Sequence, residues 1–337
     1  MGRGGGRRAP YAGPLQLHGE VTVDPLVVVQ ILVAAAQDMV LALAVGALAC
    51  SAMLERQPSA CPAASAALGR SRLAALVLLV LACGLYLWLQ AAVMGGTPFS
   101  EAGPVVSAVL TQSHFGIAWS VGCAGAVLAC FGGARRGRTA GWVATAGMIV
   151  YVAGKAAASH AADAGDFTLR EGIHVLHLSA TALWAGSVIV AAPVLWRWNS
   201  NAAVSTEATT VASAGPANRV AFCAQLSHLA TVALAVVIVT GIYNATQDTA
   251  HLTAPLLGVL YGRVLALKLV LVTLAVLLGG YNRMIYLPRL QHTAADGGPA
   301  YRDAQRSFDR LLAVEAVAMV AILVVAGVLG HTSPSGG

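Results

Sequence analysis

The sequence predicts an all-α membrane protein in which eight transmembrane helices form one bundle, and three observations favour this fold class. Of the 337 residues, 58% are hydrophobic and only 10% are Asp, Glu, Lys or Arg, whereas about 25% of the residues are charged in a typical soluble domain. The mean hydropathy is +0.74. Apolar runs recur that are long enough to cross about 30 Å of hydrocarbon as helices. These observations exclude a soluble globular protein.

Each apolar run defines one expected helix. Residues 1–23 are Gly- and Arg-rich and too polar to insert, and the first run is too long, and too polar at Gln37 and Asp38, for a cleaved signal peptide. We expect a polar flexible tail over 1–23, the eight-helix domain over 24–331 and a short tail over 332–337. The expected spans are Leu26 to Ser51, Leu73 to Met94, His114 to Phe131, Gly141 to Ala158, Ile173 to Trp196, Val220 to Ala245, Val264 to Met284 and Leu311 to Gly330.

The arginines predict the orientation of the bundle. Thirteen of them lie in the loops after the first, third, fifth and seventh spans, whereas only Arg170 and Arg263 lie in the opposite loops. Because positively charged loops stay in the cytoplasm, we predict that both termini are outside, despite three arginines in the N-terminal tail. The formal charge of +6 therefore reflects topology and does not indicate nucleic-acid binding. The longest connections, Asn199 to Asn218 and Leu287 to Arg310, are expected to be flexible cytoplasmic loops.

Histidines gather at the outer ends of the expected spans. His174 and His177 are three residues apart and share a helix face, and the hairpin before them can bring His160 close. Imidazoles with a carboxylate suit Cu(II) or Zn(II), whereas Cu(I) accepts two or three imidazoles or an added Met. The alternative is that these histidines merely occupy helix ends that meet water. The predicted metal ligands are His160, His174, His177 and His114, with Asp163, Asp166 and Met94 as candidates for further ligands or for orienting a ring.

Several ionisable residues fall inside the expected spans. Each costs about 2.5 to 3.5 kcal/mol at a helix centre, so these side chains should face the interior of the bundle and pair. Asp38, Lys155 and Lys268 are predicted either to form structural ion pairs or to line a polar transport path. The full set is Asp38, Lys155, His228, Lys268 and Glu315.

The remaining motifs exclude several classes of protein. The six cysteines contain no Cys-x-x-Cys pair, and Cys123 and Cys130 share a helix face where they would either pack or meet Cu(I) in transit. No Walker loop, dinucleotide glycine fingerprint or zinc-protease helix occurs in the sequence. We therefore expect neither an enzyme nor an ATP-driven pump.

Five segments resemble motifs of the copper resistance protein D (CopD) family, in order and at suitable spacing. The segment His177 to Gly186 resembles the family's His-(x)6-Trp-x-Gly motif. The resemblance covers most of residues 24–330. The other similar segments are Val23 to Leu26, Thr240 to Asn244, Tyr261 to Lys268 and Gly280 to Arg283.

The resemblance implies a protein of the bacterial inner membrane that moves copper, often with a periplasmic copper-binding partner of the CopC type. It would place His177, with His160 and His174, at an outer copper site, and both termini in the periplasm. His174 stands where many relatives carry Asp, and Gln30 where a basic residue is common. The expected function is copper transport, with uptake into the cytoplasm, of copper as Cu(I) or Cu(II).

Two other functions remain open on the sequence alone. One is a b-type cytochrome that holds haem through histidines on facing helices, such as His177 and His114, and exchanges electrons with quinone. The other is a structural membrane subunit. A haem absorption band in the purified protein would decide for the cytochrome.

Overall fold

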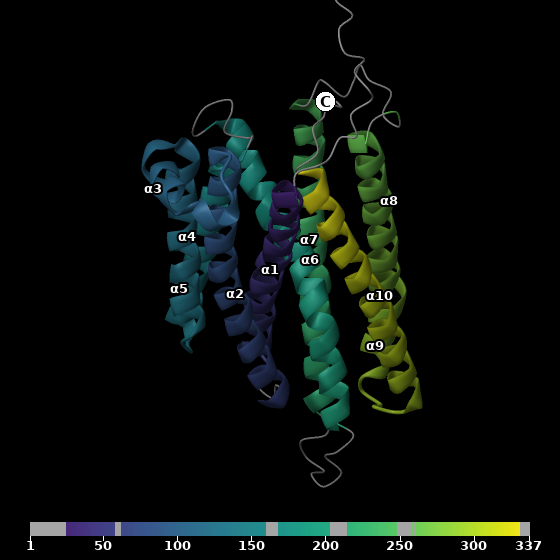
Figure 1. Cartoon of the computed structure of the whole chain (residues 1–337). Coiled ribbons are helices and arrows are strands. Elements are labelled where there is room, and N and C mark those ends of the chain that lie inside the picture. Colours follow the sequence, from purple (N-terminus) through teal and green to yellow (C-terminus); the bar gives the residue numbers. More distant parts are fainter. Residues whose placement is uncertain are drawn as a thin grey trace, which may run out of the picture.

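The computed structural model describes residues 25–57, 62–159, 168–202, 214–247, 258 and 260–330, and these residues form helices and no strands. Eight helical segments of this part are long and apolar enough to cross a membrane, which confirms the predicted fold class and the number of spans. They stand side by side in one bundle (Figure 1). The spans are α1 (Pro25–Glu55), α2 (Pro62–Gly95), α4 (His114–Gly133), α5 (Arg138–Ala157), α6 (Leu169–Ala202), α7 (Ala214–Gln247), α8 (Leu260–Tyr281) with its extension, and α10 (Pro299–Leu329).

Two short helices that the sequence analysis did not predict connect α2 to α4. These are η1 (Phe99–Glu101) and α3 (Gly103–Gln112). The indole Nε1 of Trp88 in α2 donates a hydrogen bond to the carbonyl of Phe99 at 2.8 Å, which holds η1 against the end of α2. The hydroxyl of Ser113 accepts from the backbone N–H of Gly116 at 2.9 Å and caps the start of α4.

The connection between α8 and α10 is helical, so the prediction of a flexible loop over Leu287 to Arg310 is wrong. A π-helical turn, η4 (Asn282–Tyr286), continues α8 and leads into α9 (Leu287–Thr293), and α10 already begins at Pro299. Leu290 is fully buried, so α9 is anchored in the core. Pro299 lies in the first turn of α10, where a missing N–H costs nothing.

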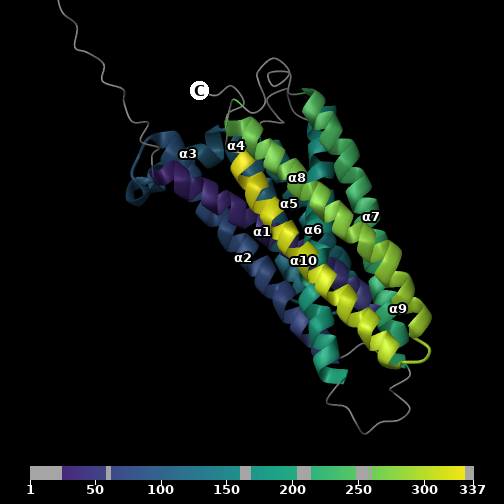
Figure 2. The same ribbon diagram turned by 90° about the vertical axis from the view of Figure 1, so that its right-hand side faces the viewer.

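Helix α6 lies at the centre of the bundle and packs against α1, α2, α5, α7 and α10. Helix α8 packs mainly on α10, and its outer face exposes Leu267, Val270 and Leu277, as expected of side chains that meet lipid. The start of α1 and the end of α10 lie at the same end of the bundle (Figures 1 and 2), as an even number of spans requires. The side of the membrane on which this end lies stays a prediction.

Glycines let two helix pairs approach closely. A Cβ atom on Gly46 of α1 would overlap the backbone of Gly186 in α6, and a Cβ atom on Gly186 would overlap that of Ala42. Gly125 of α4 and Gly147 of α5 make a similar contact. Small residues at such crossings are typical of membrane helices, because the packing of close backbones replaces the hydrophobic effect as the source of stability.

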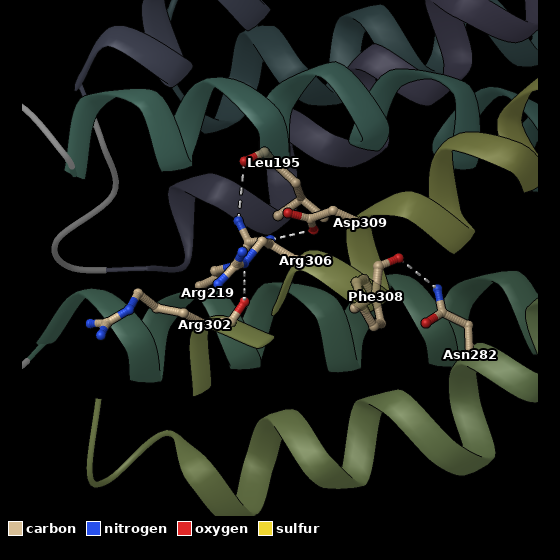
Figure 3. A network of polar contacts seen from close by, with 7 residues as sticks. All are labelled: Leu195, Arg219, Asn282, Arg302, Arg306, Phe308 and Asp309. Carbon is tan, nitrogen blue, oxygen red and sulfur yellow. Dashed lines mark hydrogen bonds and ion pairs between the residues drawn. The ribbon is translucent and has the colours of Figure 1, made fainter. Parts of the chain in front are cut away.

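A polar network ties α6, α7 and α10 together near the end of the bundle where α6 leads to α7 (Figure 3). The buried guanidinium of Arg219 in α7 donates to the carbonyl of Leu195 in α6 at 3.2 Å and forms an ion pair with Asp309 of α10. Asn282 of η4 donates to the carbonyl of Phe308 at 3.4 Å. The network fixes one end of α6, whose other end carries the predicted histidine ligands.

Candidate functional site

An ion pair inside the bundle joins two of the predicted intramembrane charges. The ammonium of Lys155, in the last turn of α5, contacts the carboxylate of Asp38 in α1. The two side chains are 16% and 27% exposed, so the pair is largely shielded from lipid and water. The pairing is the arrangement that the high cost of an isolated charge in a membrane favours.

The two histidines of α6 lie beside this ion pair. Both rings are half-buried, and His174 lies within electrostatic range of Asp38 and Lys155. His177, one turn further along α6, has its Nδ1 2.8 Å from the hydroxyl oxygen of Thr240 in α7. His174 therefore links the ion pair to His177 on the same helix face.

The hydroxyl of Thr240 determines how the His177 ring is held. It donates its hydrogen to the carbonyl of Val236 at 2.6 Å, so its oxygen is left to accept from the Nδ1–H of His177. With the Thr240 hydroxyl donating to Val236, a neutral His177 ring carries its proton on Nδ1, and the lone pair of Nε2 is available to a ligand. Metal-bound histidines are commonly oriented through their second nitrogen in this way.

Lys268 of α8 joins this group of side chains. Its ammonium lies within electrostatic range of both Asp38 and His177, and its side chain is half-buried. The predicted charges Asp38, Lys155 and Lys268, from α1, α5 and α8, thus each interact electrostatically with a histidine of α6. We call these five side chains the polar region: Asp38, Lys155, His174, His177 and Lys268.

The other predicted ligands are placed differently. His160, Asp163 and Asp166 lie outside the described residues. His114 is exposed at the first residue of α4, and Met94 is exposed near the end of α2. Among the described residues, no three His, Cys, Asp or Glu side chains gather closely enough to hold a metal ion. The complete ligand set therefore stays a prediction.

Two polar contacts between helices were not predicted from the sequence. Gln30 is buried on α1, where its amide donates to the side chain of Gln90 in α2. Thr240, the hydrogen-bond partner of His177, had been noted only as part of a motif. Polar residues in apolar spans were a usable signal for Gln30 and Gln90, whereas the partnership of Thr240 depends on the packing of α6 against α7.

A cavity of about 200 Å³ lies between α6, α7, α8 and α10. Glu315 and Arg283 line it, together with mainly apolar side chains. The guanidinium of Arg283 donates to the hydroxyl groups of Ser227 and Thr231, both at 3.0 Å. Glu315 is buried against Gly279, so this intramembrane carboxyl faces the interior as predicted.

Two family models match the chain over most of its length. The model described as copper resistance protein D-like, N-terminal domain, matches residues 23–169, and the model described as copper resistance protein D matches residues 220–329. The chain belongs to the copper resistance protein D family. Neither a curated protein nor a solved structure gives a significant match.

Membership makes the chain a multi-pass protein of the bacterial inner membrane with a part in copper resistance. The N-terminal match contains Asp38 and Lys155, and the second match contains Thr240 and Lys268. His174 and His177 lie between the two matched ranges. The polar region thus joins side chains from both parts of this copper resistance protein D member through the central helix α6.

Proposed function

We propose that the protein transports copper across the inner membrane, from periplasm to cytoplasm, through a site that includes His174 and His177. The observation that supports this most strongly is the polar region itself. Charged groups from three helices interact electrostatically with the two histidines within spans that are otherwise apolar. Such groups are expensive in lipid and are retained mainly where an ion or proton passes.

The chemistry of the histidines fits copper. Imidazole nitrogen binds both Cu(II) and Cu(I), and the Thr240 contact leaves Nε2 of His177 free to act as a ligand. We propose His160 as the further ligand, with Asp163, Asp166, His114 and Met94 as lesser candidates. A periplasmic protein of the CopC type is the proposed copper donor. We propose no catalytic step, so the protein acts as a permease rather than an enzyme.

Copper uptake into membrane vesicles tests the proposal. We expect His177→Ala and His174→Ala to lower uptake at least about tenfold, as the loss of a metal-binding group commonly does. His292→Ala, which changes an exposed histidine of α9, serves as the matched control and should leave uptake unchanged. Uptake should occur in right-side-out vesicles and not in inverted ones.

Three results would contradict the proposal. Uptake that is unchanged in both α6 variants would remove the histidines from the path. Uptake confined to inverted vesicles would reverse the direction. A haem absorption band in the purified protein would favour the cytochrome alternative, in which His177 would be an axial ligand.

A further inference from the structure

A second group of side chains that could bind a metal lies between α2 and α4. The indole Nε1 of Trp119 in α4 donates to the carbonyl of Cys83 in α2 at 3.2 Å, and this bond places the two helices side by side at this level. Cys123 follows Trp119 by one helical turn and lies on the same face. This spacing places the thiol of Cys123 on the side of α4 that faces Cys83, and the two thiols interact electrostatically.

Two polar side chains from other helices surround the thiols. The amide Nε2 of Gln37 in α1 lies 3.7 Å from the sulfur of Cys83. Tyr151 of α5 is fully buried, and its hydroxyl lies beside the thiol of Cys83. Two thiols, an amide and a phenol from four helices thus gather in an otherwise apolar part of the bundle.

The two thiols favour Cu(I) as the metal ion bound at this site. Soft thiolates bind Cu(I) well, whereas Zn(II) is normally held by three or four protein ligands, and the described residues offer two sulfurs and no third His, Cys, Asp or Glu. Both thiols are free rather than joined in a disulfide. A Cu(I) ion held by two thiolates carries one negative charge, and Lys155, which is paired with Asp38, lies within electrostatic range of Cys83.

We propose that Cys83 and Cys123 form an intramembrane Cu(I) site that receives copper from the polar region. Two S–Cu bonds form and two S–H bonds break, the protons pass to solvent, and copper arrives and stays as Cu(I). Gln37, the residue before Asp38 in α1, lies 3.7 Å from the sulfur of Cys83, so the thiols adjoin the polar region at Asp38. This site rests on the proposed transport and specifies its second binding step.

Anaerobic Cu(I) titration of the purified full chain, against a chromophoric Cu(I) chelator, tests the site. We expect Cys83→Ser and Cys123→Ser each to weaken the tightest Cu(I) binding at least about tenfold. Cys130→Ser is the matched control, because Cys130 lies on the same face of α4 and is also half-buried. X-ray absorption of the wild-type complex should show sulfur neighbours, and either of the two serine variants should lose them.

Alkylation of the wild-type chain tests the site without relying on variants, which could fail to fold. Bound Cu(I) should protect Cys123 from alkylation while leaving Cys130 reactive. A wild-type copper spectrum with nitrogen or oxygen neighbours only, or equal alkylation of Cys123 with and without Cu(I), would overturn the thiol site. Vesicle uptake separates the two hypotheses. Sulfur-bound Cu(I) without uptake would refute transport alone, and uptake without sulfur neighbours would refute the thiol site alone.

Discussion

The ion pair between Asp38 and Lys155 should contribute measurably to stability, and its removal makes a quantitative test. Breaking a fully buried pair by removing one partner costs about 3 to 5 kcal/mol, whereas an exposed pair contributes about 0 to 1 kcal/mol. These side chains are 27% and 16% exposed, which lies between the two cases. We therefore expect Asp38→Asn or Lys155→Met to lower the free energy of unfolding by about 2 kcal/mol.

The double variant separates the interaction energy between Asp38 and Lys155 from the effects of each substitution on its other neighbours. Each single substitution leaves the other charge unpaired. The double variant Asp38→Asn, Lys155→Met should therefore lose less free energy of unfolding than the sum of the losses in the two single variants, with a coupling energy of about 1 to 2 kcal/mol. Reversible unfolding of the full chain in mixed micelles measures each term. The control is Asp303→Asn, whose pair with Arg306 is 72% and 65% exposed and should change stability by less than about 0.5 kcal/mol. A coupling energy below about 0.5 kcal/mol would refute the reasoning.

Two further predictions concern packing and orientation. Gly46→Ala should cost about 1 to 3 kcal/mol in the same unfolding assay, because its Cβ would overlap the backbone of Gly186, whereas Gly69→Ala, with open space around it, should cost nothing. A stable Gly46→Ala variant would contradict the close contact between α1 and α6. Reporter fusions at Gly337 and within the Asn199 to Asn218 connection should report opposite sides of the membrane, with Gly337 outside. A reporter that is active only in the cytoplasm at Gly337 would reverse the orientation.

The fold could be predicted from the sequence wherever a property of one segment decides it. The number of spans followed from the apolar runs, because lipid requires each segment to satisfy its own backbone as a helix. The prediction of a loop over Leu287 to Arg310 was wrong because packing against other helices, and not a property of the segment alone, decides its structure. Its charged residues suggested a water-exposed connection, while Leu290 and Phe308 bury one face of α9 and α10 against the bundle.

In the candidate site, too, some features depend on a single helix and others depend on packing between helices. The sequence by itself predicted that Asp38, Lys155 and Lys268 face inward, because an ionised side chain is too costly to face lipid, and that His174 and His177 share one face of their helix. The same rule was wrong for His228, which is exposed on α7. Only the tertiary structure decided which groups meet. It pairs Asp38 with Lys155, sets Thr240 against His177, and turns Cys123 toward Cys83 of another helix instead of Cys130 of its own. Such partners depend on how helices distant in the sequence pack, and periodicity within one helix carries no information about that.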